Sequence, residues 1–217
     1  MTKISSKRTL TDYGKVQVLI SDIIRNKKIF MNTDKIKQYN YLDIGCGPHM
    51  SNDFINLDYQ WRKGIDICWD LTKKDLPLDS NSIEGVFTEH CFEHIPFESF
   101  EQNMREIYRV LKKDCIMRLI MPDGELYVDL YVERRNGSKK LMPYESDETR
   151  TSMQSINQIF RGHGHLFIYD FETIKIILER VGFKNIVKQQ YRFGQNDKLI
   201  KDTPHRSVES LYVEATK

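Results

Sequence analysis

Short apolar runs alternate with amphipathic stretches along most of the chain. Four apolar runs lie between residues 41 and 89, and each is closed at its C-terminal end by glycine or a polar residue. Two other segments, 97–111 and 170–181, carry apolar side chains at helical spacing. Strands that alternate with helices predict an α/β domain with a mostly parallel sheet, in which the carboxyl ends of the strands line a ligand crevice.

The two ends of the chain carry different patterns. Near the C-terminus, Asp170 and Gly182 predict the start and end of a helix, and 183–187 and 211–215 predict the last two strands. The first forty residues predict a helix with one apolar stripe, made of Val16, Leu19, Ile20, Ile23 and Ile24. We expect this helix to pack across the main sheet, and the alternative is a lid or a partner-binding helix.

Composition and charge narrow the class of protein. The 217 residues are 40% hydrophobic, which is enough for a core, and 33 basic against 31 acidic residues leave no field that favours nucleic acid. No apolar run approaches the roughly 18 residues of a membrane span, and no apolar segment follows the charged N-terminus as in a secretory signal. The four cysteines lack CxxC spacing, so we expect reduced thiols in a cytoplasmic protein: Cys46, Cys68, Cys91 and Cys115.

A glycine turn follows the first predicted strand. Gly45 and Gly47 allow the backbone to approach a bound molecule closely because neither has a Cβ. A dinucleotide site would have G-x-G-x-x-G, but Met50 stands at the third glycine position and Pro48 lacks an amide donor. The turn therefore argues against NAD or FAD and favours a ligand without phosphate at this point.

Acidic residues close the next two strands. Asp58 lies where a carboxylate can accept both hydroxyls of a ribose, and Asp70 lies where one can accept from an adenine amino group. Either residue alone would more commonly cap a turn. The ordered set of glycine turn and two acids predicts an adenosine pocket without phosphate recognition.

The motif Leu42-Asp-Ile-Gly-Cys-Gly47 resembles the first motif of class I S-adenosylmethionine-dependent methyltransferases. Residues 82–94 resemble the fourth strand and following helix of their type 11 subgroup. Four further segments resemble a small bacterial group of predicted methyltransferases often associated with cell-surface polysaccharide genes: 54–58, 75–79, 121–123 and 210–215. The resemblance covers about residues 40 to 216.

This resemblance implies a Rossmann-like class I methyltransferase fold, with a seven-stranded, mostly parallel sheet of order 3-2-1-4-5-7-6 and an antiparallel last strand. It implies S-adenosylmethionine as cofactor and S-adenosylhomocysteine as product. The cofactor contacts that it implies are Asp43, Gly45, Cys46, Gly47, Asp58, Asp70, Leu71 and Glu89. Only residues 48–53 separate the glycine turn from the second strand, so the first crossover helix is expected to be shortened to a turn.

The domain organisation follows from the same comparison. Residues 40–217 are expected to form the S-adenosylmethionine-binding methyltransferase domain. The segment 1–39 is expected to be an N-terminal helical cap. A second cap is expected at the insertion of about 134–166, which is charged in its first half and contains Gly137 and Pro143.

Methyl transfer to a hydroxyl requires a base as well as alignment of the acceptor. Glu89 and His90, just past the fourth strand, are the catalytic candidates. His163, His165 and Tyr127 are candidates for substrate contact. His163-Gly-His165 could supply half of a metal site, but no spacing matches a known zinc pattern, so no metal is predicted.

The predicted function is methyl transfer to a small-molecule or glycan-precursor acceptor, on oxygen. One alternative is a non-catalytic partner module that binds S-adenosylmethionine or S-adenosylhomocysteine. A second is a nicotinamide-dependent oxidoreductase, against which Pro48 and Met50 argue. Nucleic-acid methylation is weaker still, because the chain lacks a basic face and an Asn-Pro-Pro-Tyr-like segment after the fourth strand. The sequence does not predict an oligomeric state.

Overall fold

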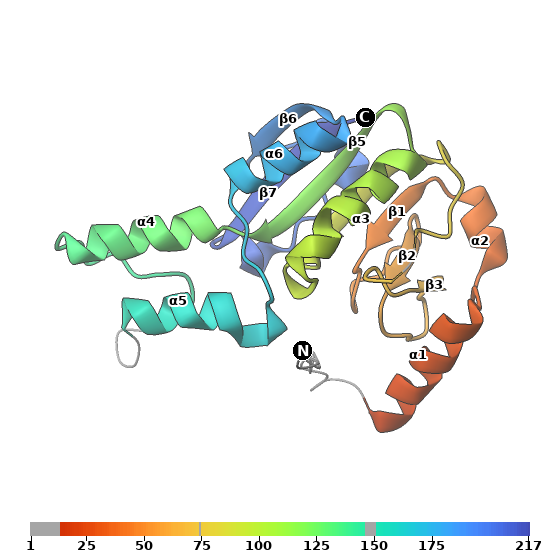
Figure 1. Cartoon of the computed structure of the whole chain (residues 1–217), viewed down its shortest axis with the longest axis horizontal. Coiled ribbons are helices and arrows are strands. Elements are labelled where there is room, and N and C mark those ends of the chain that lie inside the picture. Colours follow the sequence, from red (N-terminus) through yellow and green to blue (C-terminus); the bar gives the residue numbers. More distant parts are fainter. Residues whose placement is uncertain (1–13, 74, 146–150) are drawn as a thin grey trace.

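The computed structural model describes residues 14–73, 75–145 and 151–217, which are organised around one seven-stranded sheet (Figure 1). The strand order is β3-β2-β1-β4-β5-β7-β6, and β7 runs antiparallel to both of its neighbours. The predicted order and the antiparallel last strand are confirmed. The strands are β1 Tyr41–Ile44, β2 Ile55–Asp58, β3 Ile67–Cys68, β4 Ile83–Glu89, β5 Leu111–Pro122, β6 Lys184–Gln189 and β7 Ser210–Thr216.

Two helices, α3 (Phe97–Val110) and α6 (Phe171–Val181), cover one face of this sheet (Figure 1). Their apolar sides are fully buried against the strands, as Phe100, Met104 and Ile174 illustrate. Helix α6 has the predicted ends. The Asp170 side chain accepts a hydrogen bond of 2.8 Å from the Thr173 amide, and Gly182 ends the helix at φ 113°.

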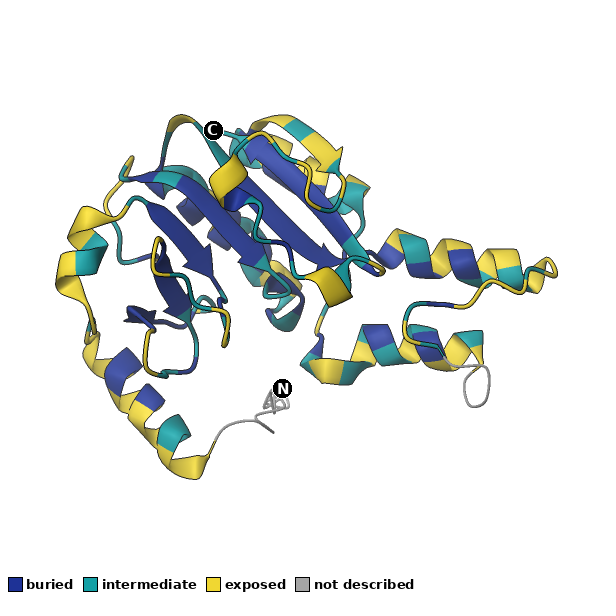
Figure 2. Ribbon diagram, turned by 180° about the vertical axis from the view of Figure 1, so that it is seen from behind, coloured by how far each residue is buried: buried dark blue, intermediate teal, exposed yellow. Residues whose placement is uncertain are grey.

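The opposite face of the sheet is crossed by the connection between β6 and β7 (Figure 2). This connection contains two 3₁₀-helices, η3 (Asp197–Leu199) and η4 (Pro204–Arg206). It packs through Leu199 into a second buried cluster, whose other members are Tyr41, Phe54, Phe87, Ile120 and Tyr212. The chain between the last two strands therefore supplies the packing on this face.

Arg118, in the middle of β5, fixes that connection to the sheet. Its side chain and those of Asp202 and Glu214 are completely buried. The guanidinium donates to Asp202 (Nε to Oδ1, 2.8 Å) and to Glu214 (Nη1 to Oε1, 2.9 Å). It also donates to the backbone carbonyl of Phe193 at 2.8 Å. Because a planar guanidinium reaches several acceptors at once, one side chain holds β5, β7 and their covering loop together.

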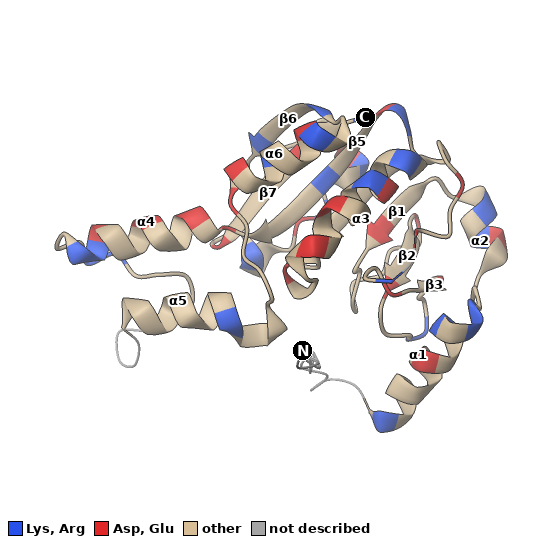
Figure 3. Cartoon of the chain, in the orientation of Figure 1, with Lys and Arg blue, Asp and Glu red and all other residues tan. Residues whose placement is uncertain are grey.

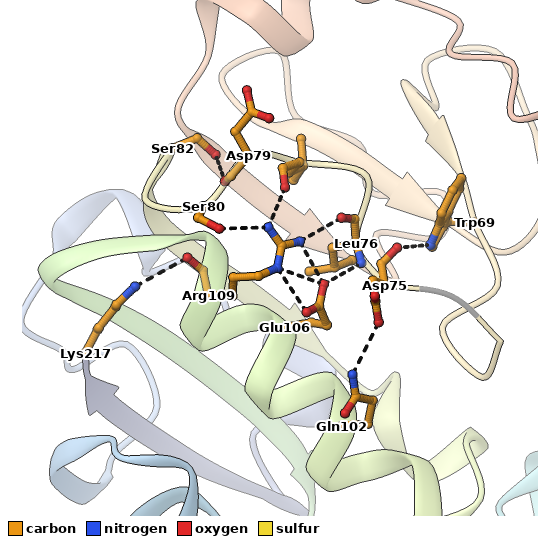
Figure 4. A network of polar contacts seen from close by, with 11 residues as sticks. Trp69, Asp75, Leu76, Asp79, Ser80, Ser82, Gln102, Glu106, Arg109 and Lys217 are labelled. Atoms are coloured by element: carbon orange, nitrogen blue, oxygen red, sulfur yellow. Dashed lines mark hydrogen bonds and ion pairs between the residues drawn. The ribbon is translucent and has the colours of Figure 1, made fainter.

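The connections among the first four strands are short. Residues 45–54, all of them described, contain no helix, so the predicted shortening of the first crossover is confirmed. The connection from β3 to β4 is held on α3 instead (Figure 4). Arg109 donates to the carbonyl oxygens of Leu76 and Leu78 at 2.8 Å each, and Glu106 accepts from the Leu76 amide at 2.8 Å.

The N-terminal helices α1 (Lys15–Lys27) and α2 (Thr33–Gln38) lie beyond the β3 edge, and α1 does not pack across the sheet as expected (Figure 1). Of the predicted stripe, Ile24 is buried, whereas Val16 is 71% exposed and Leu19 61%. The inner side of α1 is polar: the Ser21 hydroxyl accepts from the Trp61 amide at 2.9 Å. Nε2 of Gln17 also donates to the Trp61 carbonyl at 2.8 Å. These two hydrogen bonds and the burial of Ile24 decide which side of the helix faces the domain.

Helices α4 (Gly124–Arg135) and α5 (Ser152–Arg161) lie side by side and extend beyond the sheet (Figures 1 and 2). They pack through a small apolar cluster of Tyr127, Leu130, Met142 and Ile159. The predicted insertion of 134–166 thus includes the end of α4, the described part of the following loop and α5. Residues 146–150 of that prediction lie outside the described residues. The 3₁₀-helix η2 (Gly162–Gly164) leads back to the sheet.

Charged residues are mixed over the surface. Figure 3 shows basic and acidic side chains interspersed along α3, α4 and α6, in line with the nearly equal numbers of the two signs. In the part of the chain that the structure describes, every helix is too short or too polar to cross a membrane.

Candidate active site

A cavity of about 900 Å³ lies at the carboxyl ends of β1, β2 and β4. Parallel strands end at the same edge of a sheet, and this edge is where α/β proteins bind ligands. Seven of the eight predicted cofactor residues line the cavity: Asp43, Gly45, Cys46, Gly47, Asp58, Leu71 and Glu89. The structure therefore brings together residues that are spread over 47 positions of the sequence.

Gly45 and Gly47 differ in the space around the position that a Cβ would occupy. A Cβ on Gly45 would lie 2.5 Å from Sγ of Cys91, so this glycine allows two chain segments to pack against each other. A Cβ on Gly47 would have no described atom within 4 Å. Both adopt positive φ, 72° and 54°. Only Gly47 therefore presents open backbone to the cavity.

Asp58, the last residue of β2, joins the second strand to the glycine turn. Its Oδ2 accepts a hydrogen bond of 2.9 Å from the Gly47 amide, and its Oδ1 accepts one of 2.8 Å from the Gln60 amide. A carboxylate has about four lone-pair sites, so it can accept further hydrogen bonds from a diol. The predicted ribose contact is compatible with this geometry.

Asp70 is not among the residues that line the cavity, although its neighbour Leu71 is. Its Oδ1 accepts from the amide and the hydroxyl of Thr72, at 3.0 and 2.7 Å, and its Oδ2 lies 3.4 Å from Nζ of Lys73. The carboxylate stabilises the turn after β3. The adenine contact stays a prediction for Asp70, whose carboxylate is outside the lining of the cavity.

Asp43, in β1, is buried beside a lysine that the sequence analysis did not identify. Its carboxylate forms an ion pair and hydrogen bond with Lys201, from the β6–β7 connection. Burial raises the pKa of Asp43 to about 6, an effect that Lys201 partly offsets. The ammonium of Lys201 also lies 4.2 Å from the centre of the Phe54 ring and 4.9 Å from that of Phe87.

Glu89, at the end of β4, is bound to the same connection. One carboxylate oxygen accepts from the Thr203 amide at 2.9 Å, and the other accepts from the Thr203 hydroxyl. Each oxygen therefore already holds a donor of the protein. Glu89 secures the cavity wall, which leaves His90 as the better candidate for a base.

His90 occupies a strained position at the end of β4, with a positive φ of 51°. Its Nε2 lies 2.8 Å from the Ser210 hydroxyl, and its Nδ1 lies 3.4 Å from Oε1 of Glu93. Burial lowers the pKa of His90 well below its usual range, so the ring is neutral at pH 7 and one nitrogen carries a lone pair. Burial has the opposite effect on the carboxyl of Glu93, whose pKa rises to about 8.

A second cavity, of about 470 Å³, adjoins the first. The two cavities share His90, His94, His163, His205 and Arg206. His163, His165 and Tyr127, the candidates for substrate contact, all line the second cavity. All six histidines of the chain line one cavity or both, since His49 lines the first.

Sequence reasoning missed the wall that comes from the β6–β7 connection. Lys201, Thr203 and Arg206 line the first cavity, and nothing in the local pattern connects them with the glycine turn. One signal was available: Thr203-Pro-His-Arg206 places polar and titratable residues in a loop, where binding residues are common. Two further residues of the second cavity, Tyr144 and Glu209, were also missed.

The fold is shared with solved methyltransferases over nearly the whole chain. A SAM-dependent methyltransferase from Archaeoglobus fulgidus aligns with a TM-score of 0.51 at 15% identity, covering 93% of this chain and 94% of that one. A SAM-dependent methyltransferase from Thermotoga maritima, described as a possible histamine N-methyltransferase, aligns with a TM-score of 0.53 at 15% identity, covering 93% and 90%. The chain therefore has the Rossmann-like class I methyltransferase fold.

The sequence supports the same class. A family model described as a methyltransferase domain matches residues 58–119, which run from the end of β2 into β5. No protein of curated function matches the chain significantly. The family match covers 62 of the 217 residues, and the solved structures above share the fold.

Proposed function

We propose that this chain binds S-adenosylmethionine in the first cavity and transfers its methyl group to an oxygen of a small, hydroxyl-rich acceptor in the second. The observation that carries the proposal is the position of His90, whose neutral imidazole lies in the wall between the two cavities. A sugar or glycan precursor is the acceptor class that we favour.

The residues of the first cavity fit the cofactor. Its volume of about 900 Å³ is within the usual range for ligand pockets. Asp58 supplies acceptors for a ribose, and Trp69 and Leu71 supply apolar surface for a base. Pro48 offers no amide to a phosphate, which suits a nucleoside without one.

The proposed mechanism follows from the two cavities. S-adenosylmethionine supplies an electrophilic methyl group when bound. Gly47 and Asp58 hold the nucleoside, and the polar wall of the second cavity orients the acceptor hydroxyl. His90 takes the hydroxyl proton as the oxygen attacks the methyl group. General-base catalysis of this kind accelerates a reaction by about 10²- to 10⁴-fold. Ser210, 2.8 Å from Nε2, orients the ring.

The lining of the second cavity supports a hydroxyl-rich acceptor. Imidazoles, the phenols of Tyr127 and Tyr144 and the carboxylate of Glu209 offer both donors and acceptors of hydrogen bonds. The two phenols donate to Glu209, at 3.1 and 3.2 Å, which fixes one side of the cavity.

The four cysteines, all in described residues, are free thiols. Because thiols stay reduced in the cytoplasm, we propose the cytoplasm as the compartment of this protein.

The first test is thermal unfolding with S-adenosylhomocysteine, with NAD and ATP as controls. A ligand at about 100 times its Kd adds about 2.7 kcal/mol, which raises the midpoint by roughly 5–10 °C in a domain of this size. The proposal requires a rise with S-adenosylhomocysteine alone. A rise with NAD instead would identify an oxidoreductase and overturn it.

The second test is transfer of a labelled methyl group from S-adenosylmethionine to a panel of sugars and sugar nucleotides. Labelled product whose methyl is released by ether cleavage, and not by amine or thioether chemistry, supports transfer to oxygen. Binding of S-adenosylhomocysteine without turnover on any acceptor class would favour the alternative of a non-catalytic binding module.

A further inference from the structure

Three potential metal ligands meet in the wall of the second cavity. Glu93 and His94 belong to the 3₁₀-helix η1 (Phe92–His94), which follows β4, and His165 follows η2. The two segments are joined because the Leu166 amide donates to the Glu93 carbonyl at 2.7 Å. One ligand atom from each of Glu93, His94 and His165 lies within 4.8 Å of the other two.

The carboxylate of Glu93 is buried without a donor. Its side chain has no exposed surface, and neither oxygen accepts a hydrogen bond from any described residue. Glu89, four residues earlier, differs from Glu93 because Thr203 donates hydrogen bonds to both of its carboxylate oxygens. Two histidine nitrogens lie near Oε1, His90 Nδ1 at 3.4 Å and His94 Nε2 at 3.9 Å, but neither forms a hydrogen bond with it. A buried carboxylate without a hydrogen-bond donor is costly, so a cation at Glu93 would offset the cost of its burial.

His165 is held as a metal-binding histidine usually is. Its Nδ1 lies 2.6 Å from the backbone carbonyl of Ile159, so this nitrogen carries the hydrogen and Nε2 carries the lone pair. Proteins commonly fix the orientation of a metal-binding imidazole by a hydrogen bond from its non-ligating nitrogen to a backbone carbonyl. The ring of His94 lies against that of His165, with centroids 4.9 Å apart.

We propose that Glu93, His94 and His165 bind one divalent transition-metal ion, of the class to which Zn²⁺ belongs. Two imidazoles and one carboxylate are a ligand set that zinc and non-haem iron use when they keep an open position. Bonds of about 2.0–2.2 Å put ligand atoms roughly 3.0–3.5 Å apart. His94 Nε2 lies 3.9 Å from Glu93 Oε1, so a small rotation of the partly exposed His94 closes the set.

Short ligand spacings in the sequence predict no metal site. Seventy-one positions separate His94 from His165, and the fold alone brings them together. The HxH pair is also misleading. His163 lies 3.1 Å from Nε2 of Gln158, outside the set of ligands, whereas His165 belongs to it.

The open coordination position would face the second cavity, which all three ligands line. This step rests on the proposed function. A hydroxyl of the acceptor bound there would lose its proton more easily because the metal stabilises the alkoxide. His90 takes that proton, the oxygen forms the new bond to the methyl carbon, and the sulfonium keeps the electron pair of the broken bond as a thioether.

The test measures zinc itself. The purified chain is stripped with a chelator, dialysed against Zn²⁺ and examined by elemental analysis and titration calorimetry. The variants are Glu93→Gln and His165→Gln, and the matched control is Glu98→Gln, an exposed acid outside the set and outside both cavities. We expect one zinc per wild-type chain, unchanged binding in the control and an affinity lower by about 100-fold or more in both site variants.

Two results would overturn the metal site. One is the absence of stoichiometric zinc on the wild-type chain, and the other is equal zinc affinity in Glu93→Gln and the control. Thermal unfolding provides a second readout, because zinc should raise the midpoint of the wild type but not that of Glu93→Gln. Binding of S-adenosylhomocysteine to the same samples shows whether the variants are folded, and it distinguishes failure of the metal site from failure of the proposed function.

Discussion

The backbone amide of Gly47 donates a hydrogen bond of 2.9 Å to Oδ2 of Asp58. The glycine turn after β1 and the end of β2 are therefore one unit, although the crossover between these strands has no helix. In a longer crossover, a helix N-terminus could orient the turn. Here a single carboxylate does so.

This hydrogen bond predicts that Asp58→Ala loses both stability and affinity for S-adenosylhomocysteine. Removal of the carboxylate leaves the amides of Gly47 and Gln60 without acceptors, and the free energy of unfolding should fall by about 1–3 kcal/mol. Titration calorimetry should detect no binding of S-adenosylhomocysteine. The control is Asp53→Ala, an exposed acid five residues earlier. Unchanged affinity in Asp58→Ala would contradict the pocket described above.

The two glycines should respond differently to alanine. Both substitutions place a side chain at positive φ, which costs about 1–2 kcal/mol. Gly45→Ala adds a clash with Cys91, so its stability in denaturant titrations should be clearly the lower of the two. Gly47→Ala should remain folded but bind S-adenosylhomocysteine more weakly. Equal stability of the two variants would show that the packing on Cys91 is not limiting.

The Asp43–Lys201 pair should give a stability change that depends on pH. The pKa of Asp43 rises from 3.8 unfolded to about 6 folded, so between these values the folded state holds more protons. The contribution of Asp43 to stability is therefore complete below its unfolded pKa and is lost as pH rises through about 6. Without Lys201 the ionised carboxylate would be buried with no cation, and this loss would extend to higher pH.

Lys201→Met should accordingly be much less stable than the wild type at pH 8, by about 3–5 kcal/mol, and closer to it at pH 5. Thermal unfolding across this pH range measures the difference. Lys198→Met is the matched control, because Lys198 lies over the Tyr41 ring in the same connection and does not pair with Asp43. An equal loss of stability in Lys201→Met at pH 5 and pH 8 would contradict the ion pair.

His90→Asn tests the proposed base. Asparagine tolerates the positive φ of this position and cannot accept a proton at neutral pH. Single-turnover methyl transfer should slow by about 10²- to 10⁴-fold. Binding of S-adenosylhomocysteine should be retained, because His90 is not among the predicted cofactor contacts. Retained turnover in this variant would move the base to another group.

The ends of α6 could be predicted because their signals are local, whereas the strand order came from the resemblance to class I methyltransferases. The Asp170 cap and the glycine at 182 lie within one turn of the helix ends that they define. The glycine turn and Asp58 could be predicted for a similar reason, since parallel strands bring their carboxyl ends to one edge. These signals need no knowledge of distant neighbours.

Other features depend on neighbours that the sequence does not reveal. The stripe of α1 shows that the helix has an apolar side, but hydrogen bonds to Trp61 turn the polar side inward. Asp70 has the expected position along the chain, but the structure turns its carboxylate toward Thr72 and leaves it outside the cavity lining. The partners of Asp43 and Glu89 come from more than a hundred residues away, in Lys201 and Thr203.

The β6–β7 connection has a consequence for the order in which the site can form. A partly folded chain with β1, β2 and β4 paired would already have the glycine turn and Asp58 in place, but not Lys201 or Thr203. Those two residues arrive only when β7 pairs with β5 and Arg118 closes on Asp202. A chain in which β7 had not paired would therefore offer half of a pocket, and S-adenosylhomocysteine binding would report whether the β6–β7 connection is in place.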